Sequence, residues 1–390
     1  MLLPRLLPTD FLRFKVGRDD MEVFMAAFSD GINELNGVLI RLTANCSSLA
    51  TLALRYALIS LSFQRLGVPL RAAQNQLHAI RALQAVIEQP LPWDEADAFR
   101  AVAASVVLYI FEMQNAESSM NWVVYFDGAR RIAEKAYKGG GDNGCDAQLL
   151  MDWVFSHCTM YQFSFFYWVR REYPQAWLAR QRRLVHTSVS SPLRQVILPL
   201  YGCSLELLDT LHDVLLNCLD RTDSEYMSQR HKDILDQLTD RLQNLIQRER
   251  VGDDRTDSPQ SSHARQVAEA FRLAALLFLE RVARNSRRDA PRVARLRSEA
   301  FALLGNMRIC DRPWPLFVLS IEAEDGDQRR LTLAMMERIM KRGPQAKFAP
   351  VCNMVREAWA LQDLAVGDEI DALDLYRALI QSSRLPPLFG

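Results

Sequence analysis

The sequence predicts an all-α fold, and three observations indicate it. Glycine is scarce, with 16 residues among 390, while leucine, alanine and arginine are abundant. Few segments alternate apolar and polar residues, which is the pattern of a half-buried strand. Apolar residues recur instead three and four positions apart, as they do along one face of a helix. Because 49% of the residues are hydrophobic, a chain of this length can bury a deep core.

Polar stretches divide the helical pattern into blocks. Residues 138–144, KGGGDNG, join glycines to turn-forming residues, which predicts a mobile loop. Residues 250–265 are polar and lack apolar periodicity, so we expect a second mobile loop there. The helical blocks are then 20–137, 146–249 and 265–385.

The first residues differ from the rest of the chain. We expect residues 1–19 to form an N-terminal extension and residues 20–390 to form a single domain of many helices. Pro4 and Pro8 break the first apolar run well short of the ~7–15 apolar residues of a signal peptide. No secretion signal is therefore predicted.

The first block contains helices with clear boundaries. Residues 48–67 begin at Ser48 and end at Gly67, which are typical residues for a helix start and stop. Residues 69–90 lie between two prolines, and residues 98–118 follow the same apolar pattern. The apolar residues of 69–90 have the spacing of an amphipathic helix: Leu70, Ala73, Leu77, Ile80 and Leu83.

The segment 152–171, DWVFSHCTMYQFSFFYWVRR, is crowded with aromatic residues and has no formal charge between Asp152 and Arg170. Its polar residues interrupt the apolar run, which therefore falls short of the ~20 apolar residues of a membrane span. Nearly the whole circumference of this helix is apolar, which predicts burial. Five side chains share one face by helical spacing: Trp153, His157, Tyr161, Phe165 and Trp168.

Two interpretations of this aromatic face stay open. The helix can be ordinary core. Alternatively, the five side chains form part of a pocket wall, in which His157, Tyr161 and Gln162 orient an otherwise apolar ligand.

Two later segments also allow two interpretations each. Residues 230–250 carry leucines at heptad spacing, which fits a packed surface helix or a dimer contact, although two heptads are short for a coiled coil. Residues 281–297 contain seven arginines. These suggest nucleic acid or a nuclear import signal, but without interleaved aromatic residues we favour the solvated faces of two helices that meet at Pro291.

Signatures of catalysis and metal binding are missing. The chain has no GxGxxG, GxxxxGK[ST], GxSxG or HExxH motif. The carboxylates of DDRTD, residues 253–257, have the spacing with which terpene cyclases hold magnesium, but they lie in the second predicted loop. In EDGDQ, residues 324–328, a turn followed by an acid-capped helix explains the DxD spacing. We therefore predict no cofactor and no metal site.

Charge and cysteine usage exclude further classes. Lys plus Arg and Asp plus Glu number 47 each, which argues against an overall nucleic-acid-binding surface. The seven cysteines lie far apart without a CxxC pair. They are expected to be reduced thiols in a nuclear or cytoplasmic protein, most of them filling the core.

Several segments together carry a family resemblance. They are DGARRIAE (127–134), PLYGCSLELLDTLHDVLLNCLDR (199–221), AEAFRLAALLFLERV (268–282), RPWPLFVLSIEAEDGDQRRLTLAMMERI (312–339) and VREAWALQD (355–363). The residues that carry it are Gly202, Cys203, Trp314, Pro315, Leu316, Phe317, Glu322, Ala323 and Arg330. Taken in their order along the chain, these segments resemble the fungus-specific transcription-factor domain. This domain is the helical region that follows a zinc-cluster DNA-binding module in many fungal regulators. Two positions depart from the pattern, since Asp127 stands where a His is common and Ser320 near a usual Gly.

The resemblance implies a superhelical α-domain that regulates transcription and, in the sterol-sensing members, holds an apolar ligand in a helical pocket. The family's six-cysteine zinc cluster, CxxCx6C…CxxCx6–8C, does not occur in residues 1–390. We therefore expect no direct nucleic-acid contact from this chain, and a zinc-cluster regulator or a second copy as its partner.

Three functional hypotheses follow. The first is a regulatory domain that binds an apolar small molecule or a partner protein, with a role in secondary metabolism and no membrane association. The second is a repurposed biosynthetic enzyme without a cofactor, a cyclase or isomerase that orients its substrate, with His157 and Tyr161 as acid and base. The third is a scaffold that dimerises through residues 230–250.

Overall fold

The computed structural model describes residues 34–43, 48–89, 94–113, 121–136, 145–168, 193–198, 201–249, 259–341, 345–365, 369–383, 386–387 and 389. Within these ranges the regular secondary structure consists of helices, and the only β-pairing is in isolated β-bridges. The predicted all-α class is confirmed. The chain divides into two compact units, Met1–Val154 and Phe155–Gly390. The predicted loop 138–144 and the DDRTD carboxylates lie outside the described residues.

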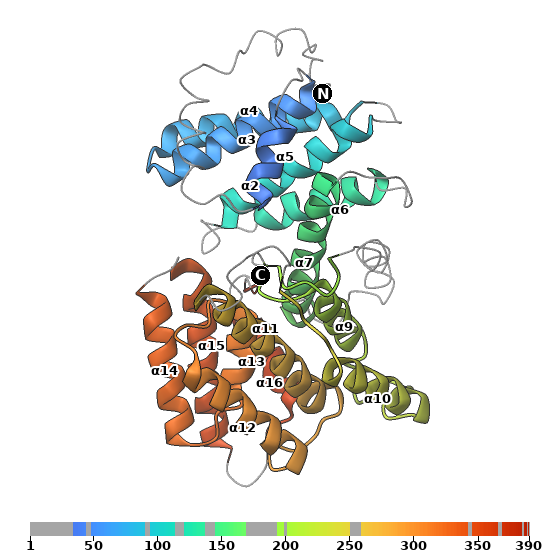
Figure 1. Ribbon diagram of the computed structural model, residues 1–390, viewed down its shortest axis with the longest axis vertical. Helices are drawn as coiled ribbons and strands as arrows, with labels where there is room; N and C mark the ends of the chain where they lie inside the picture. The colour runs from blue at the N-terminus through green and yellow to red at the C-terminus, as the bar shows by residue number, and fades with distance from the viewer. Residues whose placement is uncertain are drawn as a thin grey trace, which may run out of the picture. The chain divides into compact units, whose positions relative to one another are not determined.

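The first unit is a stack of helices (Figure 1). Its elements are α2 (Glu34–Leu42), α3 (Leu49–Arg65), α4 (Pro69–Ile87), α5 (Glu95–Met113), α6 (Asn121–Ala136) and the beginning of α7 (Cys145–Trp168). Helix α3 packs on α4 and α5, and α5 packs on α6. The side chain of Ser48 caps α3 by accepting from the Thr51 N–H, and Gly67 follows with φ of 71°. Both predicted boundaries of this helix are confirmed.

Helix α4 has a different buried face from the one that its apolar spacing suggests. Small residues, Ala72, Ala79 and Ala82, face the core. Leu70 and Leu77 point outward, with 71% and 45% of their surface exposed. The alanines allow α4 to lie close to α3, and the leucines are left on the opposite side of the helix.

The second unit surrounds a short apolar helix. Its elements are the end of α7, α9 (Leu205–Leu216), α10 (Gln229–Gln243), α11 (Pro259–Phe278), a π-helical turn (Leu279–Ala283), α12 (Pro291–Asn306), α13 (Pro313–Ile321), α14 (Gly326–Met340), α15 (Gln345–Leu364) and α16 (Ala372–Ser382). Every residue of α13 is buried, and α13 packs on α11 and α15. Asp325 caps α14 by accepting from the Gln328 N–H, so EDGDQ is the predicted turn and capped helix.

Two predicted boundaries in this unit are wrong. Helix α11 begins at Pro259, inside the predicted loop 250–265, because proline suits a first helical position. Helix α10 ends at Gln243 rather than near residue 250. There the backbone leaves the helix and pairs with another segment, since the Ile197 N–H donates to the Arg248 carbonyl at 2.7 Å.

The leucines of α10 lie inside their own unit. Leu235, Leu238 and Leu242 are 0–3% exposed, so α10 is a packed surface helix, as one of the two interpretations has it. Dimerisation stays a prediction that does not rest on these side chains.

Asp220 provides a pH test of the packing between the α9–α10 connection and α16. Hydrogen bonds from the Thr222 backbone and side chain, and one from Arg377, lower the pKa of Asp220 to about 2. This pKa lies below the ~3.9 of an unfolded aspartate, so the ionised carboxylate stabilises the fold above pH ~4, and this contribution disappears as the pH falls towards 2. We expect Asp220→Asn to lower stability at neutral pH, and the difference from wild type to shrink between pH ~4 and 2 in urea titrations. The control is Asp233→Asn, at an exposed carboxylate of α10; an equal pH trend in both variants would contradict the assignment.

Candidate functional site

The end of α7 lies in an aromatic cluster of the second unit. The ring of Phe163 lies at the centre, with centroid distances of 5.0–6.4 Å to five rings from other segments. These belong to Phe278, Trp314, Phe317, Tyr376 and Phe389. Most are in edge-to-face contact, the favourable arrangement for aromatic pairs. The predicted burial of this helix is therefore confirmed.

The polar side chains of α7 hold segments that are distant in sequence. Ser164 Oγ donates to the Pro387 carbonyl, and Trp168 Nε1 donates to the Ser383 carbonyl at 3.1 Å. Gln162 Oε1 lies 2.6 Å from His212 Nδ1 on α9. In a buried setting such groups need partners, so they hold Ser383, Pro387 and α9 against α7.

The five residues of the predicted pocket wall lie in different surroundings. Trp153 belongs to the first unit, where it is 2% exposed and its ring lies 5.7 Å from that of Tyr109. In the second unit, Tyr161 stacks on Phe165 at 5.0 Å, and Phe165 lies 6.0 Å from Trp168. The structure therefore brings three of the five together.

Two of these three residues, Tyr161 and Trp168, are partly exposed, whereas Phe165 is buried. His157, Tyr161, Phe166 and Trp168 are partly exposed, whereas the neighbouring side chains of the helix are buried. Ser156 Oγ lies 3.2 Å from His157 Nδ1. That this face binds a ligand, and that His157 and Tyr161 act as acid and base, stay predictions.

Gly202 of the family motif occupies a position that excludes a side chain. Its φ is +78°, and a Cβ atom there would lie 2.7 Å from Arg312 Nε and 2.8 Å from Val267 Cγ1. The next residue, Cys203, is fully buried, and burial raises the pKa of its thiol far above the usual range. Cys203 is therefore an inert core residue rather than a nucleophile. Cys158, Cys203, Cys218, Cys310 and Cys352 are free and buried, in agreement with the prediction that most cysteines fill the core.

The residue after this pair joins three segments. The Ser204 side chain caps α9, and its N–H donates to Gln247 Oε1 at 2.9 Å. The Gln247 amide then donates to the Ala268 carbonyl on α11 at 2.8 Å.

The other residues that carry the family resemblance lie on α13 and directly after it. Trp314 is fully buried and stacks on Phe271 at 5.8 Å, and Pro315 is buried in the first turn of the helix. Glu322 and Ala323 follow the helix and are also buried. These residues pack the unit and form no open site.

Glu322 is the centre of a buried ion network. Arg281 of the π-helical turn lies 3.3 Å from Glu322, and 2.7 Å from Glu369. Arg288 lies 3.8 Å from Glu322 and donates to the Ala323 carbonyl at 3.1 Å. The segments 268–282 and 312–339 of the resemblance therefore meet in an ion pair.

The arginine-rich segment 281–297 is not the solvated surface that we expected. The side chains of Arg281 and Arg297 are 5% and 7% exposed, and those of Arg284 and Arg288 are each 18% exposed. Acidic partners explain the difference, because a buried guanidinium must be paired. The prediction is therefore wrong for most of these arginines.

One contact between two of the motif segments could not be predicted from the sequence. Arg329 binds Asp363 through two hydrogen bonds of 2.7 Å, and its guanidinium lies 5.4 Å from the ring of Trp359. Trp359 Nε1 donates to the Ser320 carbonyl at 2.9 Å. Arg330, the residue aligned by spacing, pairs instead with Asp327 at the surface.

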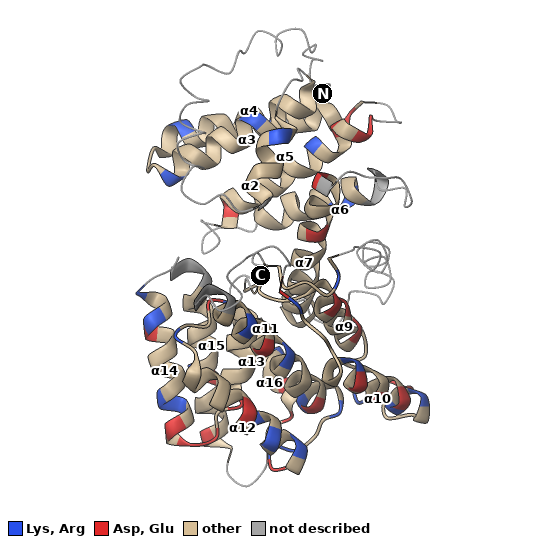
Figure 2. Ribbon diagram, viewed as in Figure 1, with Lys and Arg blue, Asp and Glu red and all other residues tan. Residues whose placement is uncertain are grey.

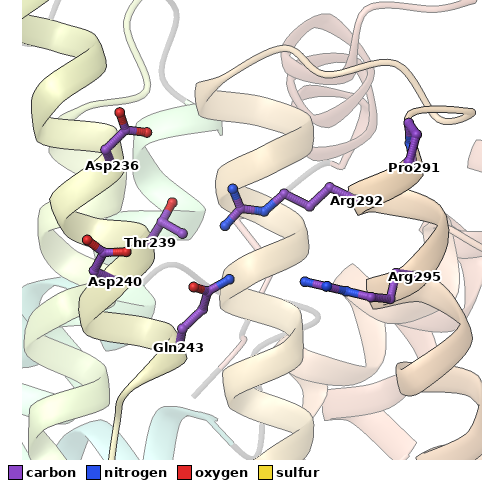
Figure 3. A pocket seen from close by; sticks show the side chains of 7 residues that line it. All are labelled: Asp236, Thr239, Asp240, Gln243, Pro291, Arg292 and Arg295. Atoms are coloured by element: carbon purple, nitrogen blue, oxygen red, sulfur yellow. The ribbon is translucent and has the colours of Figure 1, made fainter.

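A charged cleft of about 710 Å³ lies between α10 and α12. Figure 3 shows Arg292 and Arg295 extending from α12 towards α10, which presents Asp236, Thr239, Asp240 and Gln243. Part of this charge is already paired: Asp236 with Arg284 at 2.6 Å, and Arg292 with Glu280 at 3.1 Å. The lining suits a polar ligand rather than the apolar one predicted from α7.

The described ranges contain neither a metal-binding cluster nor a helix that could span a membrane. They contain no cluster of His, Cys, Asp and Glu side chains that could bind a metal ion. None of their helices combines the length and hydropathy that a bilayer span requires.

The comparisons with known proteins agree with the resemblance. The model of a family described as the fungal specific transcription factor domain matches residues 25–381, and thus parts of both units. The transcription factor iacI of Pestalotiopsis fici is 23% identical over 369 residues, which cover 94% of this chain and 91% of that protein. No solved structure matches the chain.

Gly202 is open to a direct test. We expect Gly202→Ala to destabilise the second unit by about 1–3 kcal/mol, because the positive φ is strained for alanine and the added methyl group overlaps Arg312 and Val267. Gly305→Ala on α12 is the control, since its Cβ would meet only Leu331 Cδ2 at 3.9 Å and alanine is the better helix former. Urea unfolding measures both; equal effects would contradict the close approach at Gly202.

The buried pair gives a second test. Glu322→Gln removes the negative charge that two arginines share, and we expect a loss of about 3 kcal/mol in the free energy of unfolding. The control, Glu337→Gln, breaks an exposed pair with Lys341 and should leave the urea midpoint nearly unchanged. If the two variants were equally stable, Glu322 would not be the centre of this packing.

Proposed function

The chain belongs to the fungal specific transcription factor domain family, and on this premise we propose that it is a regulatory domain that senses an apolar small molecule. The regulatory role follows from the family and from the relative iacI, a transcription factor. Ligand sensing is the finer step, and the aromatic face of α7 carries it.

The α7 face has the composition of a small-molecule site. Such sites are mostly apolar and aromatic, with a few polar groups that fix orientation. The ring of Tyr161 stacks on that of Phe165 at 5.0 Å, and the ring of Trp168 is tilted against that of Phe165 at 6.0 Å. The imidazole of His157 and the hydroxyl of Tyr161 add the polar groups. Partial exposure of His157, Tyr161 and Trp168 would leave these side chains accessible to a ligand.

The connections of α7 suggest how binding would be transmitted. Trp168 belongs to the aromatic face and also donates to the Ser383 carbonyl, and Ser164 donates to the Pro387 carbonyl. A ligand that stacks on Trp168 would bind more tightly to one arrangement of Ser383 and Pro387 than to another. Such a difference in affinity is what shifts a conformational equilibrium.

The remaining parts of the proposal concern the cell. We infer that the chain acts in the nucleus, on genes of secondary metabolism, and that it has a zinc-cluster regulator as a partner. The family supports the first inference. Chromatin association of the tagged full-length protein would test it.

Tyr161 provides the test of sensing. The full chain is incubated with sterols, polyketides and terpenoids, and melting temperature and tryptophan emission are recorded. A compound that binds should raise the melting temperature, because it binds the folded state only. Tyr161→Ala should weaken its binding about tenfold through loss of a stacking partner, while Tyr226→Ala, at another partly exposed tyrosine, should leave it unchanged.

Two outcomes would contradict the proposal. Either no compound changes the melting temperature or emission, or both tyrosine variants bind equally well. In both cases the regulatory role of the family would remain, without small-molecule sensing at α7.

A further inference from the structure

The first unit exposes apolar side chains where α3 turns into α4. Leu66 is 57% exposed, Val68 38%, Leu70 71% and Leu77 45%. They come from one continuous segment, 66–77. Single exposed leucines are ordinary, but a group of them marks an interaction surface. We call these four residues the α4 patch.

The α4 patch is not needed by the fold of its own unit. The core side of α4 is formed by Ala72, Ala79, Ala82, Leu83 and Val86. Leu70 and Leu77 lie two helical turns apart on the other side, about 10 Å along the axis. A partner that covers these leucines would bury apolar surface that the isolated unit leaves in contact with water, which favours binding.

The segment that carries the α4 patch contains basic residues and no acidic ones. Residues 49–87, which span α3 and α4, contain Arg55, Arg65, Arg71 and Arg81 and no Asp or Glu. Arg71 is exposed and its guanidinium lies 5.5 Å from the ring of Phe63. Arg81 is exposed and follows Leu77 by four residues, so it extends the same face. Figure 2 shows basic residues on these two helices.

We propose that the α4 patch docks an acidic amphipathic helix of a partner protein. Leucine or phenylalanine side chains at positions i, i+3, i+4 and i+7 of that helix would cover Leu70 and Leu77. Its carboxylates would pair with Arg71 and Arg81. Nucleic acid would use the arginines but leave the leucines uncovered, and a second copy of this face would bring arginines against arginines.

This proposal is independent of ligand sensing, because the α4 patch and the α7 face belong to different units. A failure of one leaves the other standing. It also differs from the leucine-mediated dimer contact considered for residues 230–250, where Leu235, Leu238 and Leu242 are buried in the structure.

The test uses the full chain and a fluorescent helical peptide of roughly 18 residues, long enough for five turns, with leucines at the heptad-like positions and glutamates elsewhere. We expect saturable binding in fluorescence anisotropy that weakens with added salt, since exposed charges are screened. Leu70→Ser with Leu77→Ser should weaken it about tenfold or more. Arg71→Glu with Arg81→Glu should weaken it similarly and remove its salt dependence.

Control variants distinguish binding at the α4 patch from non-specific binding of the peptide. Leu364→Ser and Arg330→Glu change a 76%-exposed leucine and an exposed arginine of the second unit, and both should bind the peptide as wild type does. A peptide with lysines in place of glutamates should not bind. Melting curves check that the variants fold; Leu66→Ser offers an alternative if the double leucine variant does not.

Several results would overturn the proposal. They are no saturable binding of the acidic peptide, equal weakening by the control variants, or equal binding of the lysine peptide. Sedimentation showing self-association that the α4 patch variants abolish would assign the surface to a second copy, and binding of anionic lipid vesicles in place of the peptide would assign it to a membrane. Either of these also rejects the acidic helix.

Discussion

The burial of one carboxylate, that of Glu322, organises the second unit. At 2% exposure it cannot be left without cationic partners, because an unpaired buried charge is strongly unfavourable. Arg281 and Arg288 meet it, at 3.3 and 3.8 Å. Arg281 can do so because the last turn of α11 widens into a π-helical turn at Leu279–Ala283. The same guanidinium then reaches Glu369, so the π turn, the end of α13 and the segment before α16 must converge.

The aromatic cluster depends on that convergence. α13 brings Trp314 and Phe317 to Phe163 of α7, and α16 brings Tyr376. Burial, and then the charge of Glu322, raise the pKa of Tyr376 well above its usual value, so the phenol stays neutral beside the ion network. The interior of the unit therefore combines a neutral aromatic half with a paired ionic half. The face of α7 that stays partly exposed lies at the edge of the aromatic half, which is why an apolar ligand is the chemistry proposed for it.

Sequence patterns located the helices better than they located the surfaces. Ser48 and Gly67 mark the two ends of α3, and the sequence predicts them because capping and a positive φ are local requirements. By contrast, the apolar spacing of α4 does not reveal that alanines face the core and that Leu70 and Leu77 face outward, since helix packing there depends on how closely α3 approaches. The arginines of 281–297 were also misjudged, because their acidic partners Glu322 and Glu369 lie far along the chain.

The sequence by itself determined the all-α class, the burial of α7, the motif residues Gly202, Trp314 and Glu322, and the family. These follow from local periodicity, capping and motif order, which need no knowledge of distant contacts. Only the tertiary structure decided which of the predicted site residues come together, separating Trp153 from Tyr161, Phe165 and Trp168. It also paired Arg329, rather than Arg330, with Asp363. The physical reason is the same in both cases: side-chain contacts between segments depend on packing in space, which periodicity along one helix does not encode.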